Sequence, residues 1–215
     1  PGRRDEYWRF TDPTLLNAPK PAPAKPVKNT GDTPVFGRIE RLKLVFVDGV
    51  FMPDASDDIS EEGLEVMRLT EASETDIHWA RDLYGVLETR GQTPVQRPLA
   101  TLNTAFASDG VLIHVTGKAP KPISLIYRHA SKTSDAILHH VVKVDSGAEL
   151  TLLENGPAAA RFNKCMEVEI ADGGVFHHVR AQGRDHERRA ATAIFTRLGE
   201  ESVFKSFTLT ANGVL

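Results

Sequence analysis

The chain has 215 residues, of which 40% are hydrophobic and 26% are charged, and its formal net charge is −3. This composition excludes collagen-like, coiled-coil and wholly disordered chains, and it provides no basic excess for bulk binding to nucleic acid. The longest stretch without a charged residue, residues 98–108, is far shorter than the roughly 20 apolar residues that span a bilayer. The single cysteine, Cys165, excludes an internal disulfide and is compatible with the reducing cytoplasm.

Residues 1–36 are predicted to form an N-terminal arm and a proline-rich strap. Six of the 13 prolines fall between residues 13 and 34, and closely spaced prolines favour an extended polyproline II chain. We therefore expect residues 19–34 to run over the surface as a strap. The arm before it carries three aromatic residues that predict an anchor on the protein body, namely Tyr7, Trp8 and Phe10.

Residues 37–117 are predicted to form a small α/β cap and the beginning of the next domain. Asp48-Gly49 separates two β-rich runs, which is a strong hairpin signal. Residues 54–76 hold nine acids and one base, and we interpret them as a solvated surface that contains one strand. A basic partner that docks on this stretch is the alternative.

Two helices are predicted within this cap. The first begins near Ser73 and carries apolar residues at helical spacing as far as Leu87, and Gly91 ends it. The second spans Pro98 to Ala107, with proline in the first turn, where its missing amide costs nothing.

Residues 118–215 contain a repeat with a period of 26 to 28 residues. The repeated units begin at Val142, Val168 and Thr196, so the intervals are 168 − 142 = 26 and 196 − 168 = 28 residues. Each unit alternates in hydrophobicity with period two, turns a polar corner and alternates again, which excludes a helical repeat. This pattern predicts a β-solenoid, and an antiparallel sandwich with evenly spaced hairpins stays open as the alternative.

Several motifs resemble the SufD branch of the SufB/SufD family of the SUF iron–sulfur cluster assembly system. They are "PGRRDEYWRFTD", "LVFVDGVF", "LATLNTAFASDGVLIHV", "VDSGAELTLLE" and "FTLTANGVL", which cover most of the chain in the right order. The resemblance implies a mainly β protein with a right-handed parallel β-helix and a small N-terminal α/β cap. Family members are longer at both ends, so we expect the β-helix here to be incomplete at the C-terminus.

The resemblance also implies a function. We expect a non-catalytic, cytoplasmic scaffold subunit that acts with SufB-like and SufC-like subunits, with a homodimer as a further option. An iron–sulfur cluster is expected only transiently in the assembled complex, and no cofactor is expected to bind this chain stably. No catalytic, cofactor-binding or metal residue carries over, because the family's interface residues and SufC-binding helices have no counterpart before Leu215.

The spacing of the histidines and of Cys165 indicates whether they can act together as metal ligands. Adjacent residues on a strand point to opposite faces, so the pairs His139-His140 and His177-His178 cannot chelate as units. The 26-residue offset stacks Cys165 over His139 on the outward face. We expect a surface cysteine beside a solvated histidine there, with a soft-metal site as the alternative.

An enzymatic function is the alternative to a scaffold. The leading rival is a β-helix carbohydrate-active enzyme that uses two outward carboxylates, and the available acids are Glu149, Glu154, Glu167 and Glu169. Phosphate-loop and nucleophile-elbow motifs are absent from the sequence. A mixed-charge cluster predicts a loop between solenoid turns rather than a nucleic-acid site, and its bases are Arg180, Arg184, Arg188 and Arg189.

Overall fold

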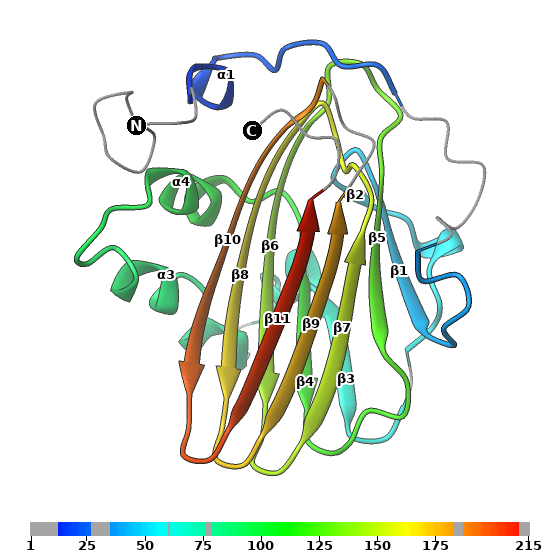
Figure 1. Ribbon diagram of the computed structural model, residues 1–215, viewed down its shortest axis with the longest axis vertical. Helices are drawn as coiled ribbons and strands as arrows, with labels where there is room; N and C mark the ends of the chain where they lie inside the picture. The colour runs from blue at the N-terminus through cyan, green and yellow to red at the C-terminus, as the bar shows by residue number, and fades with distance from the viewer. Residues whose placement is uncertain (1–12, 27–34, 60, 76–78, 183–186, 211–215) are drawn as a thin grey trace.

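The computed structural model describes residues 13–26, 35–59, 61–75, 79–182 and 187–210. The chain is mainly β, with 43% strand and 16% helix, and its strands stack as a parallel β-solenoid of about three turns (Figure 1). The predicted solenoid is therefore confirmed, and the antiparallel sandwich is excluded. The aromatic anchor at Tyr7, Trp8 and Phe10 lies outside the described residues.

Two sheets form the walls of the solenoid. Sheet A has the spatial order β11-β9-β7-β5-β1-β2, and its strands are β1 (Leu42–Val47), β2 (Val50–Phe51), β5 (Ile123–Arg128), β7 (Glu149–Asn155), β9 (Val175–Gln182) and β11 (Val203–Thr210). Sheet B has the order β10-β8-β6-β4-β3, and its strands are β3 (Leu64–Arg68), β4 (Val111–Val115), β6 (Asp135–Val144), β8 (Arg161–Ile170) and β10 (Arg189–Leu198). From β4 onward, successive strands alternate between the sheets, so each turn contributes one strand to each.

Each repeated unit in the sequence corresponds to one turn of the solenoid. Val142 on β6 pairs in register with Val168 on β8, which pairs in register with Thr196 on β10. The sheets are parallel between neighbouring turns, and each polar corner joins a strand of sheet B to the next strand of sheet A. The 26- and 28-residue periods therefore measure one full turn of the chain.

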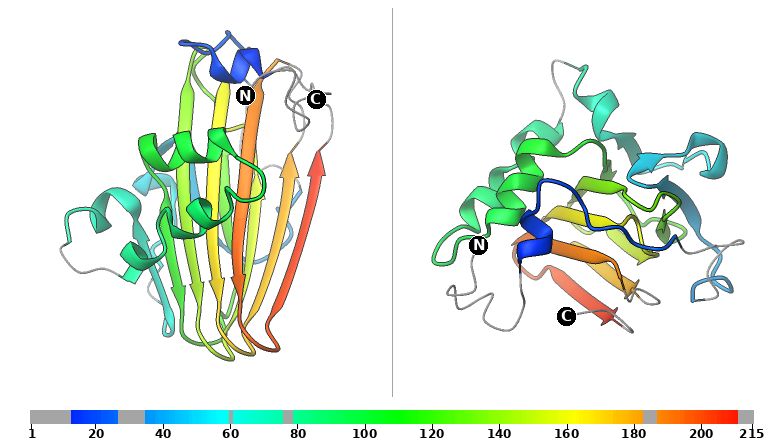
Figure 2. Two further views of the ribbon diagram at one scale, coloured as in Figure 1. Left: turned by 90° about the vertical axis from the view of Figure 1, so that its left-hand side faces the viewer. Right: turned by 90° about the horizontal axis from the view of Figure 1, so that it is seen from above.

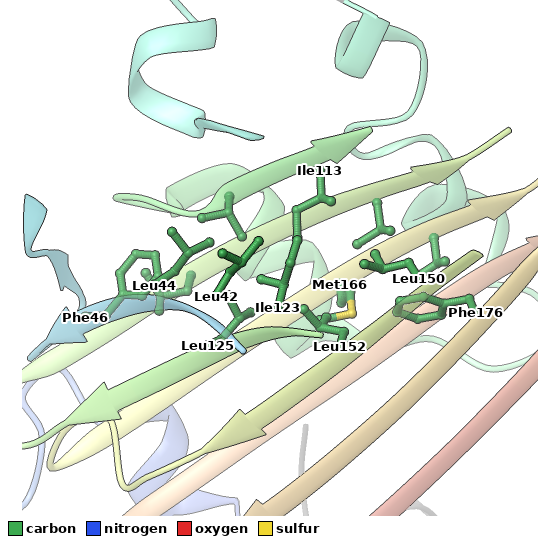
Figure 3. Packing of buried hydrophobic residues seen from close by; sticks show 14 of the residues in the cluster. Leu42, Leu44, Phe46, Ile113, Ile123, Leu125, Leu150, Leu152, Met166 and Phe176 are labelled. Atoms are coloured by element: carbon green, nitrogen blue, oxygen red, sulfur yellow. The ribbon is translucent and has the colours of Figure 1, made fainter. Parts of the chain in front are cut away.

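The core lies between the sheets and is filled by inward side chains from every turn (Figure 3). The alternation within the repeated units predicts nine inward residues, which include Leu198 and Phe204. The other seven belong to the core, namely Val142, Val144, Leu150, Leu152, Val168, Ile170 and Phe176. Phe204 packs against it while partly buried. The prediction is wrong for Leu198, which is 55% exposed because it lies on β10, the last strand of sheet B.

The first strands confirm the predicted hairpin. β1 and β2 are antiparallel around Asp48 and Gly49, whose φ angles of 50° and 84° suit a tight hairpin turn. The strand expected within the acidic stretch is β3, which pairs antiparallel with β4. Because β1 pairs in parallel with β5, the solenoid already begins within residues 37–117.

The helices agree with the sequence only in part. The second predicted helix is α4 (Pro98–Phe106), whereas the first is divided into η3 (Trp79–Asp82) and α3 (Val86–Arg90). Gly85 separates these two segments with a φ of 74°, which breaks the helical path. Ser73 does not begin a helix, since it is the C-cap of α2 (Leu69–Ala72). The remaining short elements are α1 (Thr14–Asn17) and η2 (Pro53–Ala55).

Helices α3 and α4 lie against the outer face of sheet B rather than across an end of the solenoid (Figure 2). The buried amide of Asn103 on α4 joins the two layers, because its Nδ2 donates to the carbonyls of Leu138 at 3.0 Å and Asn163 at 2.9 Å. No helix in the described ranges is long and apolar enough to cross a membrane.

Close backbone packing at Gly110 gives a stability prediction. A Cβ atom at this position would lie 1.7 Å from the carbonyl oxygen of His139, whereas one at Gly117 would meet no atom within 4 Å. We expect Gly110→Ala to lower the free energy of unfolding by about 1–3 kcal/mol, the usual cost of overpacking. Gly117→Ala is the matched control and should be nearly neutral in urea denaturation. Equal stability of the two variants would contradict this packing.

Candidate functional site

Cys165 and His139 are register neighbours on the outer face of sheet B, as the repeat offset predicts. Both side chains are fully buried, because α3 and α4 cover this face. The ring of Tyr84 lies over the ring of His139, with the centroids 4.2 Å apart. The expected surface cysteine and solvated histidine are therefore wrong, since alternation identifies the outward face of a strand but not whether helices cover it.

Glu167 attaches the start of α3 to this face. Its Oε2 accepts hydrogen bonds from the amide of Gly85 at 2.5 Å and from Nε2 of His139 at 2.8 Å. Its Oε1 accepts one from the amide of Glu88 at 2.8 Å. The first amides of a helix have no partner within the helix, and a carboxylate is well suited to accept from them. The buried glutamate thus explains why the predicted long helix is interrupted at Gly85.

The thiol of Cys165 is held in its protonated form. Burial raises the pKa of Cys165, and the carboxylates of Glu167 and Glu88 raise it further. The thiolate is the form that binds metals and attacks electrophiles. Among the residues that the structure describes, no three His, Cys, Asp or Glu side chains come together to hold a metal ion.

A second buried polar cluster lies inside the solenoid, between the two sheets. The Glu154 carboxylate accepts hydrogen bonds from Nζ of Lys164, from Nε2 of His178 at 2.6 Å and from the Tyr127 hydroxyl at 3.0 Å. The Tyr127 hydroxyl also lies 3.0 Å from Nε2 of His140. None of these five side chains is more than 2% exposed. We call this set the interior cluster.

The hydrogen bonds of the interior cluster have a defined direction. Nδ1 of His140 accepts from the amide of Val111 at 3.1 Å, so the imidazole proton lies on Nε2. Nε2 can then donate to Tyr127, whose hydroxyl donates to Glu154. His140 therefore faces the interior while His139 faces the helices, as expected for adjacent residues of one strand.

Burial and charge together determine the ionisation of the cluster. Burial alone would raise the pKa of Glu154, but Lys164 and the hydrogen bond from His178 outweigh it and hold this pKa well below its usual range. Burial lowers the pKa of Lys164 to about 8, against the opposing effect of Glu154. Burial also lowers the pKa of His140 to about 3. At neutral pH the cluster therefore combines a charged Glu154–Lys164 pair with a neutral His140.

The sequence carried a signal for this cluster. Glu154 follows Leu150 and Leu152 at two-residue intervals, and His178 follows Phe176 in the same way. The two-residue alternation of a strand therefore places both polar side chains on the same inward face as these core residues. The interpretation of Glu154 as an outward acid is wrong, because the assumption that polar residues point outward fails where buried donors compensate the charge.

The four glutamates considered for a carbohydrate-active enzyme do not form an exposed pair. Two of them, Glu154 and Glu167, are fully buried. Glu149 forms an ion pair with Lys118 at 2.8 Å, and Glu169 forms one with Arg197. Each carboxylate is thus engaged by a different structural partner.

The arginines of the predicted mixed-charge loop do not lie together, because Arg180 is on β9, which ends at Gln182, and Arg189 begins β10. Arg180 points into the solenoid from β9, and Arg188 is buried with its Nη1 3.2 Å from Nδ1 of His129. Arg189 donates to the carbonyl of Glu187 at 2.8 Å, and Arg184 lies outside the described residues. These arginines therefore do not act as one surface patch in the described part of the chain.

The burial of Cys165 predicts an unreactive thiol. We expect the native protein to react with a thiol reagent such as 5,5′-dithiobis(2-nitrobenzoic acid) orders of magnitude more slowly than the chain unfolded in guanidinium. A Cys165→Ser, Ala105→Cys variant is the control, because Ala105 lies on the exposed face of α4. Labelling of native Cys165 as fast as that of the control would show that α3 and α4 do not protect it.

The low pKa of His140 predicts a pH-dependent stability. The free side chain has a pKa near 6.5, so between about pH 6.5 and pH 3 the unfolded chain binds a proton that the folded chain does not. Stability should therefore fall as the pH is lowered through this window. In His140→Gln the slope of unfolding free energy against pH should be shallower by up to about 1.4 kcal/mol per pH unit. The control is His177→Gln, and identical slopes in His140→Gln and the wild type would contradict the assignment.

Comparisons with protein-family models and with curated proteins find no match to this chain. A function for this chain therefore has to follow from the geometry described above. That geometry consists of a filled parallel solenoid, a helical layer attached to one wall by Glu167, and a buried charged cluster between the two sheets.

Proposed function

We propose that this protein is a non-catalytic scaffold subunit of SUF-type iron–sulfur cluster assembly, which acts in the cytoplasm with a SufB-like subunit and a SufC-like ATPase. The main support is that the chain forms a parallel β-solenoid, the fold that the motif resemblance implies. The clearest of the distinctive motifs also lies where the helical layer packs against sheet B, and this placement favours a scaffold.

The segment "LNTAFASDGV" is the clearest of these motifs. It forms most of α4 and the first residue of β4, and its Asn103 holds the helical layer to sheet B. Its Asp109 pairs with Arg68 at 2.8 Å, and its Gly110 allows the backbone to pass against His139. These residues hold the fold together, and this structural role supports a scaffold rather than an enzyme.

The environment of Cys165 supports transient rather than stable contact with the cluster cargo. The thiol is buried with a raised pKa, and Nε2 of His139 is engaged by Glu167. Stable ligation by Cys165 would require the thiolate. In this proposal the chain shapes the assembly, and the ATPase activity belongs to the SufC-like subunit.

The last turn of the solenoid provides a surface for another subunit. Its exposed apolar side chains are Leu198, Phe207 and Leu209. Edge strands with exposed apolar residues favour association unless they are covered. In the proposed complex this turn is covered by neighbouring polypeptide.

Co-purification tests the proposal. The chain should be co-expressed with the SufB-like and SufC-like subunits from the same genome and analysed by gel filtration. We expect it to elute with the SufB-like subunit, whereas it should not retain the SufC-like ATPase by itself. Phe207→Asp should weaken the complex, and Phe106→Asp is the matched control because Phe106 is similarly exposed, at 68% against 60%, but lies on α4.

Two results would contradict the scaffold function. One is the absence of any complex with either subunit, although the chain is folded by circular dichroism. The other is hydrolysis of polysaccharide or ATP by the purified chain alone, which would make it an enzyme.

A further inference from the structure

The proline-rich strap is an extended segment, and the structure describes its first part, residues 19–26. Prolines occupy positions 19, 21, 23 and 26 of this part. A proline ring fixes its own φ at about −65° and keeps the preceding residue out of the helical region. Both effects favour polyproline II, an extended helix with about three residues per turn. Ala18, which joins α1 to the strap, already has such angles, with φ −60° and ψ 144°.

Burial along the strap follows the three-residue period of polyproline II. Ala24 is 2% exposed, and Pro21, which lies one turn before it, is half-buried. Lys20 and Pro23 are exposed, and Pro26, which lies one turn after Pro23, is half-buried. The edge of Pro21 and Ala24 therefore faces the body of the protein. We call the edge that carries Lys20, Pro23 and Pro26 the outer edge.

Hydrogen bonds to the main chain hold the strap against the body of the protein. The amide of Ala24 donates to the carbonyl of Lys132 at 2.9 Å, and the amide of Lys25 donates to Oε2 of Glu187 at 2.7 Å. Before the strap, the Arg161 guanidinium donates to the carbonyl of Ala18. Because the segment is already extended and attached, a partner that binds its outer edge loses little free energy in ordering it.

The outer edge combines apolar proline rings with a positive charge. In the described part of the chain, no carboxylate forms an ion pair with the side chain of Lys20, which lies one turn before Pro23. Exposed proline rings on a polyproline II segment fit between aromatic side chains. A carboxylate beside such a groove would complement the charge of Lys20. The sequence from Lys20 to Pro26 therefore presents a basic residue followed by two prolines at intervals of one turn each.

We propose that the outer edge of the strap binds a protein domain of the SH3 type, whose groove is lined by aromatic side chains and has a carboxylate at one end. Pro23 and Pro26 occupy the aromatic groove, and Lys20 pairs with the carboxylate. Domains of this type recognise Pro-x-x-Pro segments in the polyproline II conformation. The buried edge at Ala24 stays on the body of the protein during binding. This surface is independent of the proposed scaffold function, since it needs neither a SufB-like nor a SufC-like subunit.

Isothermal titration calorimetry of the full chain tests this surface with a purified SH3 domain of the class that binds basic-x-x-Pro-x-x-Pro ligands. We expect saturable binding that weakens as salt is added, because the ion pair of Lys20 is exposed. Pro23→Ala should weaken binding by about tenfold or more, as expected for the loss of an anchor that fills a pocket. Pro19→Ala is the matched control, because it removes an exposed proline of the same strap that lies off the outer edge, and it should leave the affinity unchanged.

Three results would overturn the proposal. The first is the absence of saturable binding to the folded chain. The second is equal affinity in Pro23→Ala and Pro19→Ala, which would place the contact elsewhere on the protein. The third is an unchanged affinity and salt dependence in Lys20→Gln, which would remove the charge complementarity. An SH3 domain whose groove tryptophan is replaced by alanine completes the test, and binding of this variant as tight as that of the intact domain would also exclude the outer edge as the ligand.

Discussion

A carboxylate placed among leucine, valine and phenylalanine side chains costs several kcal/mol unless hydrogen bonds and an opposite charge compensate it. Glu154 on β7 meets this requirement with donors from three other strands: Tyr127 on β5, Lys164 on β8 and His178 on β9. One side chain therefore links adjacent strands of sheet A and also joins sheet A to sheet B. A slip of one residue in any of these strands would point its donor outward, so this buried charge makes the register of the central turns specific.

Glu167 has the corresponding role on the outer face of sheet B. Its two oxygens accept from Gly85, Glu88 and His139, and this set determines where the helical layer begins. The same contacts explain the inertness of Cys165, which lies beneath this layer next to two carboxylates. The two buried glutamates thus organise the two interfaces of the molecule, one between the sheets and one between a sheet and the helices.

Local signals predicted the parts of the fold that depend on local chemistry. Asp48-Gly49 predicted its hairpin, Pro98 predicted the start of α4, and the repeat predicted the pairing of Val142 with Val168. Features that depend on distant contacts were not predicted. The break at Gly85 needs Glu167, about 80 residues away, and the inward position of Glu154 needs donors from other strands. Alternation alone gave the right face for Cys165 but could not show that helices cover it.

The two ends of the solenoid differ in how much backbone they offer for pairing. At the beginning of the sheets, the outermost strands are β2 with two residues and β3 with five. At the other end they are β10 with ten residues and β11 with eight. Short edge strands resist pairing, whereas long ones invite it. Among the described residues, the sheets therefore favour further pairing along β10 and β11 and disfavour it along β2 and β3. Any polypeptide that continues these sheets, whether of the same chain or of another, would therefore add to them on this side alone.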